Sequence, residues 1–93
     1  MDPELQDFTI ADVVISKAGR DQGKLFYVLQ AQDGYLVLAD GKIRRIEKPK
    51  RKKQRHVQKF LRSETRVAQK LRAGDKVLNS ELRRDLAYLS QEL

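Results

Sequence analysis

The sequence predicts a mainly β protein: a small five-stranded antiparallel barrel followed by one or two short C-terminal helices. The chain of 93 residues is long enough for one small domain with a thin core, and 35% of its residues are charged. Two Asp-Gly pairs, at 33–34 and 40–41, separate short apolar runs, as in tight turns between paired strands. Beyond residue 60 the apolar spacing becomes helical. We therefore expect a barrel over residues 8–60 and a helical extension over 61–93.

Four strands are expected in the first half of the chain, joined as an antiparallel meander. The run "LFYVLQ" is typical of them, because it is aromatic and β-branched, too short for a helix and bounded by turn signals. The segment "HVQKF" is expected to return as a fifth strand, and so few strands should curl into a barrel rather than leave open edges. The four strands lie near residues 10–16, 24–31, 35–39 and 42–46.

Two short helices are expected after the barrel. Ser63 can cap the first helix, and Gly74 can end it. Asn79 or Ser80 can cap the second helix, whose leucines recur at helical spacing and form one apolar stripe. We expect this stripe to pack inside the fold rather than to bind a ligand. Its members are Leu82, Leu86, Leu89 and Leu93.

Positive charge is concentrated in the middle of the chain. The net charge is +7 overall, but residues 42–59 carry ten basic and one acidic side chain, a balance of +9. Residues 1–41 carry three basic and seven acidic side chains, a balance of −4, whereas residues 60–93 carry seven basic and five acidic, a balance of +2. A local field of this density favours binding to polyanions and says nothing about the fold.

The loop "SKAGRDQGKLF" joins the first two expected strands and contains two glycines four residues apart, Gly19 and Gly23. Gly23 stands just before a strand, where a missing Cβ permits positive φ or close approach of a ligand to the backbone. Lys17, Arg20 and Lys24 surround backbone N–H groups in a combination that suits phosphate oxygens. The alternative is a simple strand connection whose charges are solvated.

A dense basic run, interrupted by Pro49, follows the fourth expected strand. Such charges repel one another unless a partner neutralises them, and each phosphate that they bind releases counterions. The run therefore favours nucleic acid, although a solvated face or a localisation signal has the same composition. An anionic membrane is less expected because the run lacks an apolar face. The basic residues are Lys48, Lys50, Arg51, Lys52, Lys53 and Arg55, to which Arg44 and Arg45 add.

No catalytic or metal-binding pattern is found in the sequence. His56 is the single histidine and there is no cysteine, so a metal site of ordinary ligand number is not expected, and no spacing indicates a catalytic triad. His56 is expected to pack, to form a hydrogen bond or to stack on a base. Phe26 and Tyr27 point to opposite faces of their strand, so at most one can stack. We expect no enzyme activity, no cofactor and no small-molecule substrate.

The chain shows no signal for export or for membrane insertion. Its start, "MDPELQDF", is acidic and lacks an apolar core, and no apolar stretch approaches the roughly 20 residues that span a bilayer. The absence of cysteine is compatible with a reducing compartment. We therefore expect a cytoplasmic monomer without a membrane partner.

Three features together resemble the KOW motif, a short strand–loop–strand unit with a hallmark glycine, which is Gly23 in this chain. They are "AGRDQGK" at 18–24, "DGYLVLADG" at 33–41 and the basic run ending in "RHVQ" at 55–58. Over about residues 10–60 the sequence is similar to the small KOW-barrel ribosomal proteins of the large subunit in archaea and eukaryotes, and to their short bacterial relatives. The tail "LRAGDKVLNSELRRDL" resembles the helical tail of some members.

This resemblance implies a small SH3-like barrel that binds RNA, usually ribosomal RNA. One departure is Lys53, which stands where relatives often have an asparagine, so we expect phosphate contacts in place of a base-specific amide contact. The positions that match the KOW loop are Gly19, Arg20, Gly23 and Lys24, and those that match the basic element are Lys50, Arg51, Arg55 and His56. The full set of expected RNA-binding residues adds Lys17, Arg44, Arg45, Lys48, Lys52, Lys53 and Lys59.

RNA binding is thus the leading functional hypothesis, with ribosomal RNA of the large subunit as the expected partner and recognition by shape and backbone charge. A DNA-binding regulator is the first alternative, in which the helix pair imitates a helix-turn-helix. Its connector of about six to eight residues exceeds the three to four residues of that motif. A protein-interaction barrel, or a KOW-type factor of the transcription machinery, is the second alternative.

Overall fold

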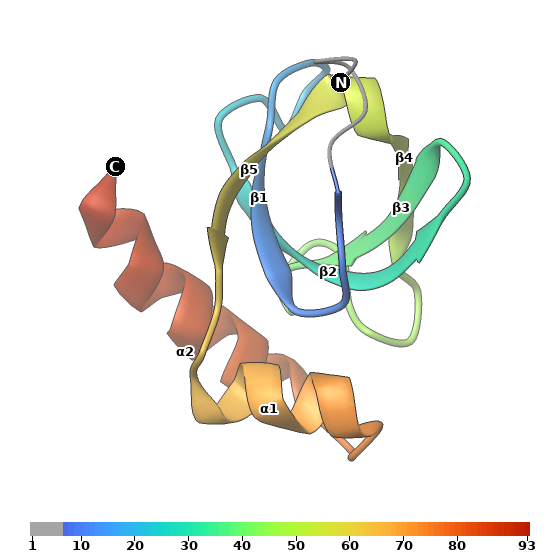
Figure 1. Ribbon diagram of the computed structural model, residues 1–93. Helices are drawn as coiled ribbons and strands as arrows, with labels where there is room; N and C mark the ends of the chain where they lie inside the picture. Colours follow the sequence, from blue (N-terminus) through green and yellow to red (C-terminus); the bar gives the residue numbers. More distant parts are fainter. Residues whose placement is uncertain (1–6) are drawn as a thin grey trace.

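The computed structural model describes residues 7–93, which form five β-strands and two α-helices. The acidic residues 1–6, from which no export signal is expected, lie outside the described part. The expected mainly β architecture with two C-terminal helices is confirmed (Figure 1). The strands are β1 (Asp12–Ser16), β2 (Leu25–Gln32), β3 (Tyr35–Ala39), β4 (Lys50–Lys53) and β5 (Val57–Arg62); the helices are α1 (Arg66–Ala73) and α2 (Asn79–Leu89); and two 3₁₀ turns are η1 (Gln54–His56) and η2 (Ser90–Glu92).

The five strands form one antiparallel sheet in the order β4-β3-β2-β1-β5. Figure 1 shows the sheet strongly curled, with β5 and β1 on one side, β3 and β4 on the other and β2 between them. The edge strands β4 and β5 are connected through η1, and within residues 7–93 no pairing between them closes the sheet. Helices α1 and α2 lie outside the curl, below and to the left of the sheet in this view (Figure 1).

The Asp33-Gly34 pair joins β2 and β3 in a tight hairpin, as the sequence predicts. Gln32 pairs with Tyr35, so only the Asp-Gly pair lies in the loop, and Gly34 has a φ of +76°. Positive φ is costly for residues that carry a Cβ, which is why a glycine suits this position. The prediction of a β-hairpin from this local pattern is confirmed.

The expected fourth strand at 42–46 is wrong, and Asp40-Gly41 does not form a hairpin turn between strands. The carboxylate of Asp40 accepts hydrogen bonds from the backbone N–H groups of Lys42 and Arg44, at 2.9 and 2.8 Å. A side chain therefore satisfies the N–H groups that a neighbouring strand would otherwise bind. The fourth strand is β4, which lies within the basic run and pairs antiparallel with β3.

Two apolar clusters lie on opposite faces of the curled sheet. One cluster contains Phe26 and residues of the strands, and the other contains Tyr27 and residues of both helices. Phe26 is 2% exposed and Tyr27 is 0% exposed, so both rings are core and neither can stack on a base. The prediction that these side chains point to opposite faces is confirmed.

The leucine stripe of α2 is buried, as expected. Leu82, Leu86 and Leu89 belong to the cluster that also contains sheet residues, so the helices and the sheet share one core. Leu93 lies beyond the end of α2 and is 64% exposed, so it does not extend the stripe. The longest helix is α2, with 11 residues. Within residues 7–93 no helix has the length and apolar character needed to cross a membrane.

The start of α1 differs from the expected one. Thr65 is the N-cap, and its hydroxyl accepts a hydrogen bond from the N–H of Ala68 at 3.2 Å. The hydroxyl of Ser63, the expected cap, bonds instead with the hydroxyl of Tyr27 at 2.8 Å. The cap prediction fails because Ser63 is recruited by a residue of the sheet.

The end of α1 agrees with the sequence, whereas the start of α2 does not. Gly74 ends α1 with a φ of +75°. The N-cap of α2 is Leu78, so Asn79 and Ser80 are the first residues of the helix. The Asn79 side chain accepts the N–H of Ile46 at 2.8 Å, which ties α2 to the loop before β4. The connector has five residues, fewer than expected and still more than the three to four of a helix-turn-helix.

Candidate nucleic-acid interface

The loop between β1 and β2 has the backbone conformation expected from its two glycines. Gly19 and Gly23 have φ values of +87° and +86°. The N–H of Gly23 donates to the carbonyl of Ser16 at 2.8 Å, and the N–H of Ser16 donates to the carbonyl of Lys24 at 3.0 Å. A Cβ on Gly23 would meet no atom within 4 Å, so the glycine is needed for its φ and not for space.

Asp21 fastens this loop to β4. Its carboxylate accepts hydrogen bonds from the ammonium groups of Lys50 at 2.6 Å and Lys52 at 2.8 Å, and from the hydroxyl of Ser16 at 2.6 Å. Burial raises the pKa of Asp21, but these hydrogen bonds outweigh burial and hold the pKa well below its ordinary value. The carboxylate therefore stays ionised and keeps the loop beside the basic run.

Lys52 is an internal cation, contrary to the expectation that it contacts RNA. The residue is only 8% exposed. Its ammonium donates to the hydroxyl of Ser16 at 2.5 Å, to the carbonyl of Ala18 at 2.7 Å and to Asp21. An ammonium has three donors, and all three are used inside the protein. The basic run therefore does not form a uniform exposed face. Side chains alternate along β4, so that Lys52 points towards the loop while Arg51 and Lys53 point towards solvent.

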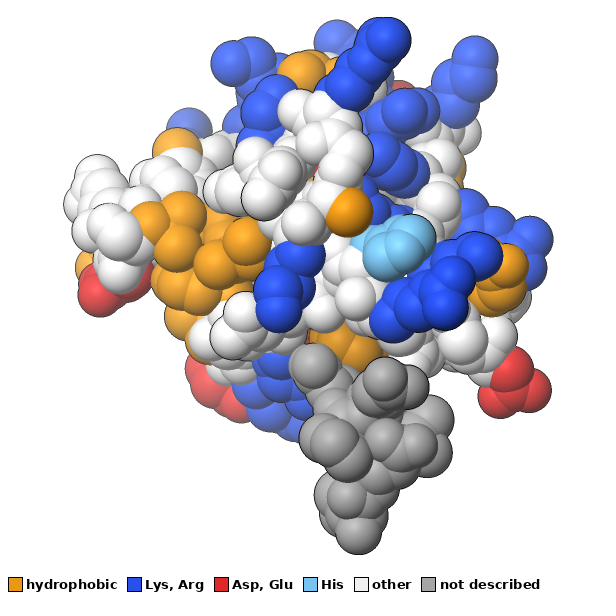
Figure 2. Space-filling view, turned by 90° about the horizontal axis from the view of Figure 1, so that it is seen from above, with side chains coloured by type: hydrophobic (Ala, Val, Ile, Leu, Met, Phe, Trp, Pro, Cys, Tyr) orange, Lys and Arg blue, Asp and Glu red, His pale blue; other side chains and the backbone are white. Residues whose placement is uncertain are grey.

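Most of the other basic side chains of the loop and the run are exposed at one end of the sheet. Figure 2 looks onto this end, where Lys and Arg side chains surround the single histidine. The carbonyl of His56 accepts the N–H of Lys17 at 2.8 Å, which joins η1 to the loop. A shallow hollow of about 430 Å³ lies between the two segments, lined by Gly19, Tyr35, His56 and all of β4. The exposed cations are Lys17, Arg20, Lys24, Arg51, Lys53 and Arg55.

Tyr35 is an aromatic side chain of this surface that sequence reasoning missed. It begins β3, pairs with Lys53 of β4 and has the guanidinium of Arg51 4.3 Å from its ring centre. A cation over an aromatic ring is a favourable contact, and both planar groups can stack on an unpaired base. The sequence did contain a signal for this residue. Tyr35 directly follows the Asp33-Gly34 turn and so begins the strand that lies next to the basic strand β4.

The remaining expected residues lie on other elements. Lys59 is half-buried on β5, where its ammonium lies 3.4 Å from a carboxylate oxygen of Asp12 and donates to the carbonyl of Asp7. Lys59 is therefore held by residues before and within β1, and the structure does not bring it to the loop. The other three expected residues, Arg44, Arg45 and Lys48, are exposed on the loop between β3 and β4, as is Lys42.

The chemistry of this end of the molecule is that of an anion-binding surface. It combines exposed ammonium and guanidinium groups with the backbone of a glycine-rich loop, and such groups contact phosphate oxygens. Among residues 7–93, no group of three His, Cys, Asp or Glu side chains could hold a metal ion. No model of a known protein family matches the chain, and no curated protein matches it. The assignment to the KOW family stays a prediction from the sequence features.

Proposed function

We propose that the protein binds structured RNA through residues 17–24 and 50–56, which we call the loop–β4 surface. The observation that carries the proposal is the contact between these two basic segments, which Asp21 holds together through Lys50 and Lys52. Like charges repel, so six exposed cations gathered at one end of a small protein suit a polyanionic partner. The ionised Asp21 offsets one of the two positive charges of Lys50 and Lys52 and so reduces that repulsion.

We also propose that the curled sheet is an SH3-like barrel of the KOW type and that the partner is ribosomal RNA of the large subunit, in the cytoplasm. The number and antiparallel order of the strands support the first part. The φ of +86° at Gly23, the position of the hallmark glycine, supports it further. The choice of ribosomal RNA follows from the resemblance alone.

Recognition by this surface depends on backbone charge and on shape. Lys and Arg contacts to phosphate fix the position of the protein on the RNA and carry no sequence information. The deep major groove of A-form RNA hides base edges from side chains, so sequence is read only where bases are unpaired. Tyr35 and Arg51 offer planar groups at such places, beside the hollow that the loop and β4 enclose.

A salt titration of RNA binding tests this proposal. Arg51, Lys53 and Arg55 are replaced together by Ala, while Lys50 and Lys52 are kept because they hold the loop. The slope of log affinity against log salt should fall by about 0.7–0.9 for each phosphate that the variant no longer neutralises. Affinity should decrease to the same extent for a structured ribosomal RNA fragment and for a random RNA duplex, because phosphate contacts do not read sequence.

The matched control removes the same charge from the helical side of the molecule. Arg66, Lys76 and Arg84 are exposed on α1, on the connector and on α2. Their replacement by Ala should leave the salt slope close to that of the wild type. An unchanged slope in the loop–β4 variant, or an equal decrease in the control, contradicts the proposal. Tighter binding to duplex DNA than to RNA favours the DNA-binding alternative.

A further inference from the structure

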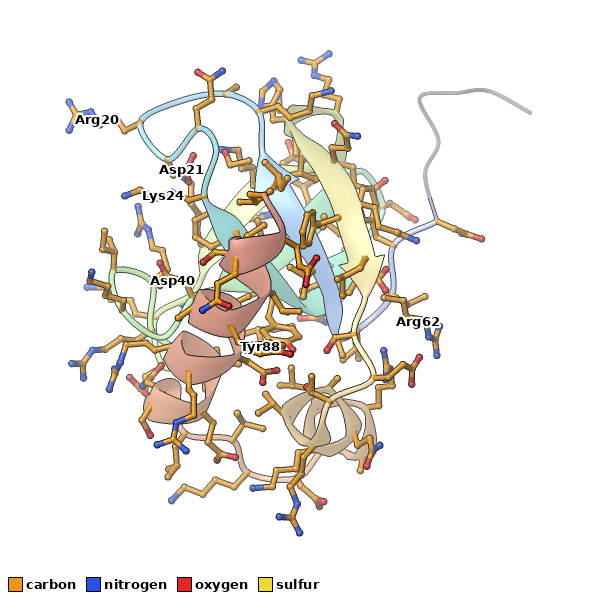
Figure 3. All side chains as sticks on the ribbon, turned by 90° about the vertical axis from the view of Figure 1, so that its left-hand side faces the viewer. Arg20, Asp21, Lys24, Asp40, Arg62 and Tyr88 are labelled. Carbon is orange, nitrogen blue, oxygen red and sulfur yellow. The ribbon has the colours of Figure 1, made fainter. Side chains whose placement is uncertain are left out.

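A second hollow, of about 280 Å³, lies between the β1–β2 loop and the turn after β3. This volume is close to the lower end of small-ligand sites, about 300 Å³, so the hollow has room for one base-sized group. Figure 3 shows Arg20, Asp21, Lys24 and Asp40 along the same side of the molecule, and Arg62 on the other side. The lining residues are Arg20, Asp21, Lys24, Phe26, Asp40, Ile43, Arg44 and Lys50.

Three cations at the rim of this hollow are available to an anion. Arg20, Lys24 and Arg44 are exposed, and none of them forms an ion pair with another described residue. Lys50 and Asp21 also line the hollow, but they are paired with each other, and Lys52 further offsets the charge of Asp21. Three unpaired cations around one small hollow suit the phosphate of a nucleotide.

Asp40, which lines the same hollow, has a carboxylate oxygen that can accept a further hydrogen bond. Its Oδ1 atom accepts the N–H groups of Lys42 and Arg44, which fixes the carboxylate in the turn. Within the described part of the chain, no group donates a hydrogen bond to Oδ2 of Asp40. An ionised carboxylate is an acceptor only, so a ligand next to Oδ2 must present a donor.

Ile43 supplies an apolar surface beside this acceptor. The residue is 65% exposed although it is large and apolar, and it lines the hollow. A nucleotide offers a phosphate, an apolar base face and a polar base edge. The rim cations, Ile43 and Asp40 match these three features in turn.

We infer that this hollow binds one unpaired nucleotide of the RNA and prefers a base that carries an exocyclic amino group. The inference rests on the proposed function and adds a base preference to it. The phosphate lies on the rim cations, the base lies on Ile43, and its amino group donates to Oδ2 of Asp40. Cytosine presents such a donor where uracil presents the O4 acceptor, which the carboxylate repels.

The wild-type protein provides the first test. Its affinity is measured for short single-stranded oligocytidylate and oligouridylate of equal length, at one salt concentration. Both have the same backbone charge and the same ring size, so phosphate contacts contribute equally. We expect oligocytidylate to bind roughly tenfold more tightly, which corresponds to one hydrogen bond to a charged group.

The variant Asp40→Asn provides the sharper test. The Asn side-chain oxygen can keep the hydrogen bonds from Lys42 and Arg44, while its amide nitrogen replaces the free acceptor by a donor. The preference for cytosine over uracil should therefore be lost or reversed. Removal of a negative charge should tighten the binding of both oligomers to the same extent. The ratio of the two affinities cancels this effect and is therefore the quantity to compare.

Asp33→Asn is the matched control, because Asp33 is exposed on the β2–β3 turn and does not line the hollow. It makes the same change of charge and should leave the ratio unchanged. Equal wild-type affinities for the two oligomers, or a wild-type ratio in folded Asp40→Asn, overturn the base preference alone. Failure of the protein to bind either oligomer or the structured RNA overturns the proposed function itself.

Discussion

Among single residues, Asp21 links the two segments of the loop–β4 surface through its bonds with Lys50 and Lys52. Its side chain is 12% exposed and faces the ammonium of Lys52, whose side chain is 7% exposed. Removal of one partner of such a pair leaves a buried charge without compensation, whereas replacement of both partners by apolar groups is often neutral. Asp21 is thus a positioning residue: it holds the loop beside β4 through its bonds with Lys50, Lys52 and Ser16.

Asp21→Asn is expected to lower the free energy of unfolding by on the order of 3 kcal/mol, because Lys52 loses its charge partner. Adding Lys52→Met keeps an apolar stem and removes the unpaired charge, so the double variant should recover much of the stability. Urea denaturation of the wild type, the two single variants and the double variant measures both effects. A double variant no more stable than Asp21→Asn would contradict this role of the pair.

The same ion pair predicts a pH dependence of stability. Burial raises the pKa of Asp21, but the hydrogen bonds from Lys50, Lys52 and Ser16 lower it by more, so the net shift is downward. A carboxylate with a lowered pKa stabilises the fold fully above its unfolded pKa of about 3.9, and this stabilisation is lost as the pH falls towards the folded pKa. The difference in unfolding free energy between the wild type and Asp21→Asn should stay constant from neutral pH to about pH 5 and shrink below about pH 4. A difference that shrinks close to neutral pH contradicts this assignment.

Among the elements, α2 holds the sheet and the helices together. Leu86 lies in the middle of its buried stripe and is 6% exposed, so Leu86→Ala should lower the free energy of unfolding by about 2–5 kcal/mol. Leu93→Ala is the matched control, because Leu93 is 64% exposed and its truncation should change stability by less than about 0.5 kcal/mol. Thermal or urea denaturation measures both. Unchanged stability together with abolished RNA binding in Leu86→Ala would show that the stripe is part of the ligand surface.

The two Asp-Gly turns show which elements a local pattern can predict. The turn at Asp33-Gly34 has the positive φ at Gly34 that the Asp-Gly pair favours in a hairpin, so the dipeptide predicts it. The turn at Asp40-Gly41 packs against α2: a Cβ on Gly41 would lie 2.2 Å from the carbonyl oxygen of Asn79. The two residues are far apart in the sequence, so no local pattern reveals this contact. For that reason Asp40-Gly41 resembles a hairpin turn in the sequence, and it wrongly predicts a fourth strand directly after it.

At the scale of the whole molecule, a polar cluster connects the sheet to both helices. The hydroxyl of Tyr27 donates to the carboxylate of Asp85 and bonds with Ser63 at 2.8 Å, and Thr65 donates to Asp85 at 2.6 Å. Burial raises the pKa of Tyr27 to about 12, and the hydrogen bond to Asp85 contributes to the rise. The phenol thus remains a donor over the physiological pH range. With the shared apolar core, this cluster makes the sheet and the helices one unit.

The candidate site was predictable in its charge and only partly in its geometry. The charge balance of residues 42–59 and the glycines of the β1–β2 loop can be read directly from the sequence. These two features alone indicate an anion-binding surface. Whether a given lysine of the run faces solvent depends on the register of β4 with β3, which places Lys52 inside. The pairing of β3 with β4 brings Tyr35 to the basic run, and the fold brings the turn that holds Asp40 to the β1–β2 loop, so their residue types alone do not single them out.

Crosslinking of the protein to RNA in its native cell, followed by sequencing of the bound fragments, tests the central claim most directly. We predict that the fragments map to a discrete helix of the large-subunit ribosomal RNA. The crosslinked peptides should come from residues 17–24 and 50–56, because these carry the exposed cations and Tyr35 lies beside them. Dispersed messenger RNA, genomic DNA, or crosslinks confined to α1 and α2 would contradict the account.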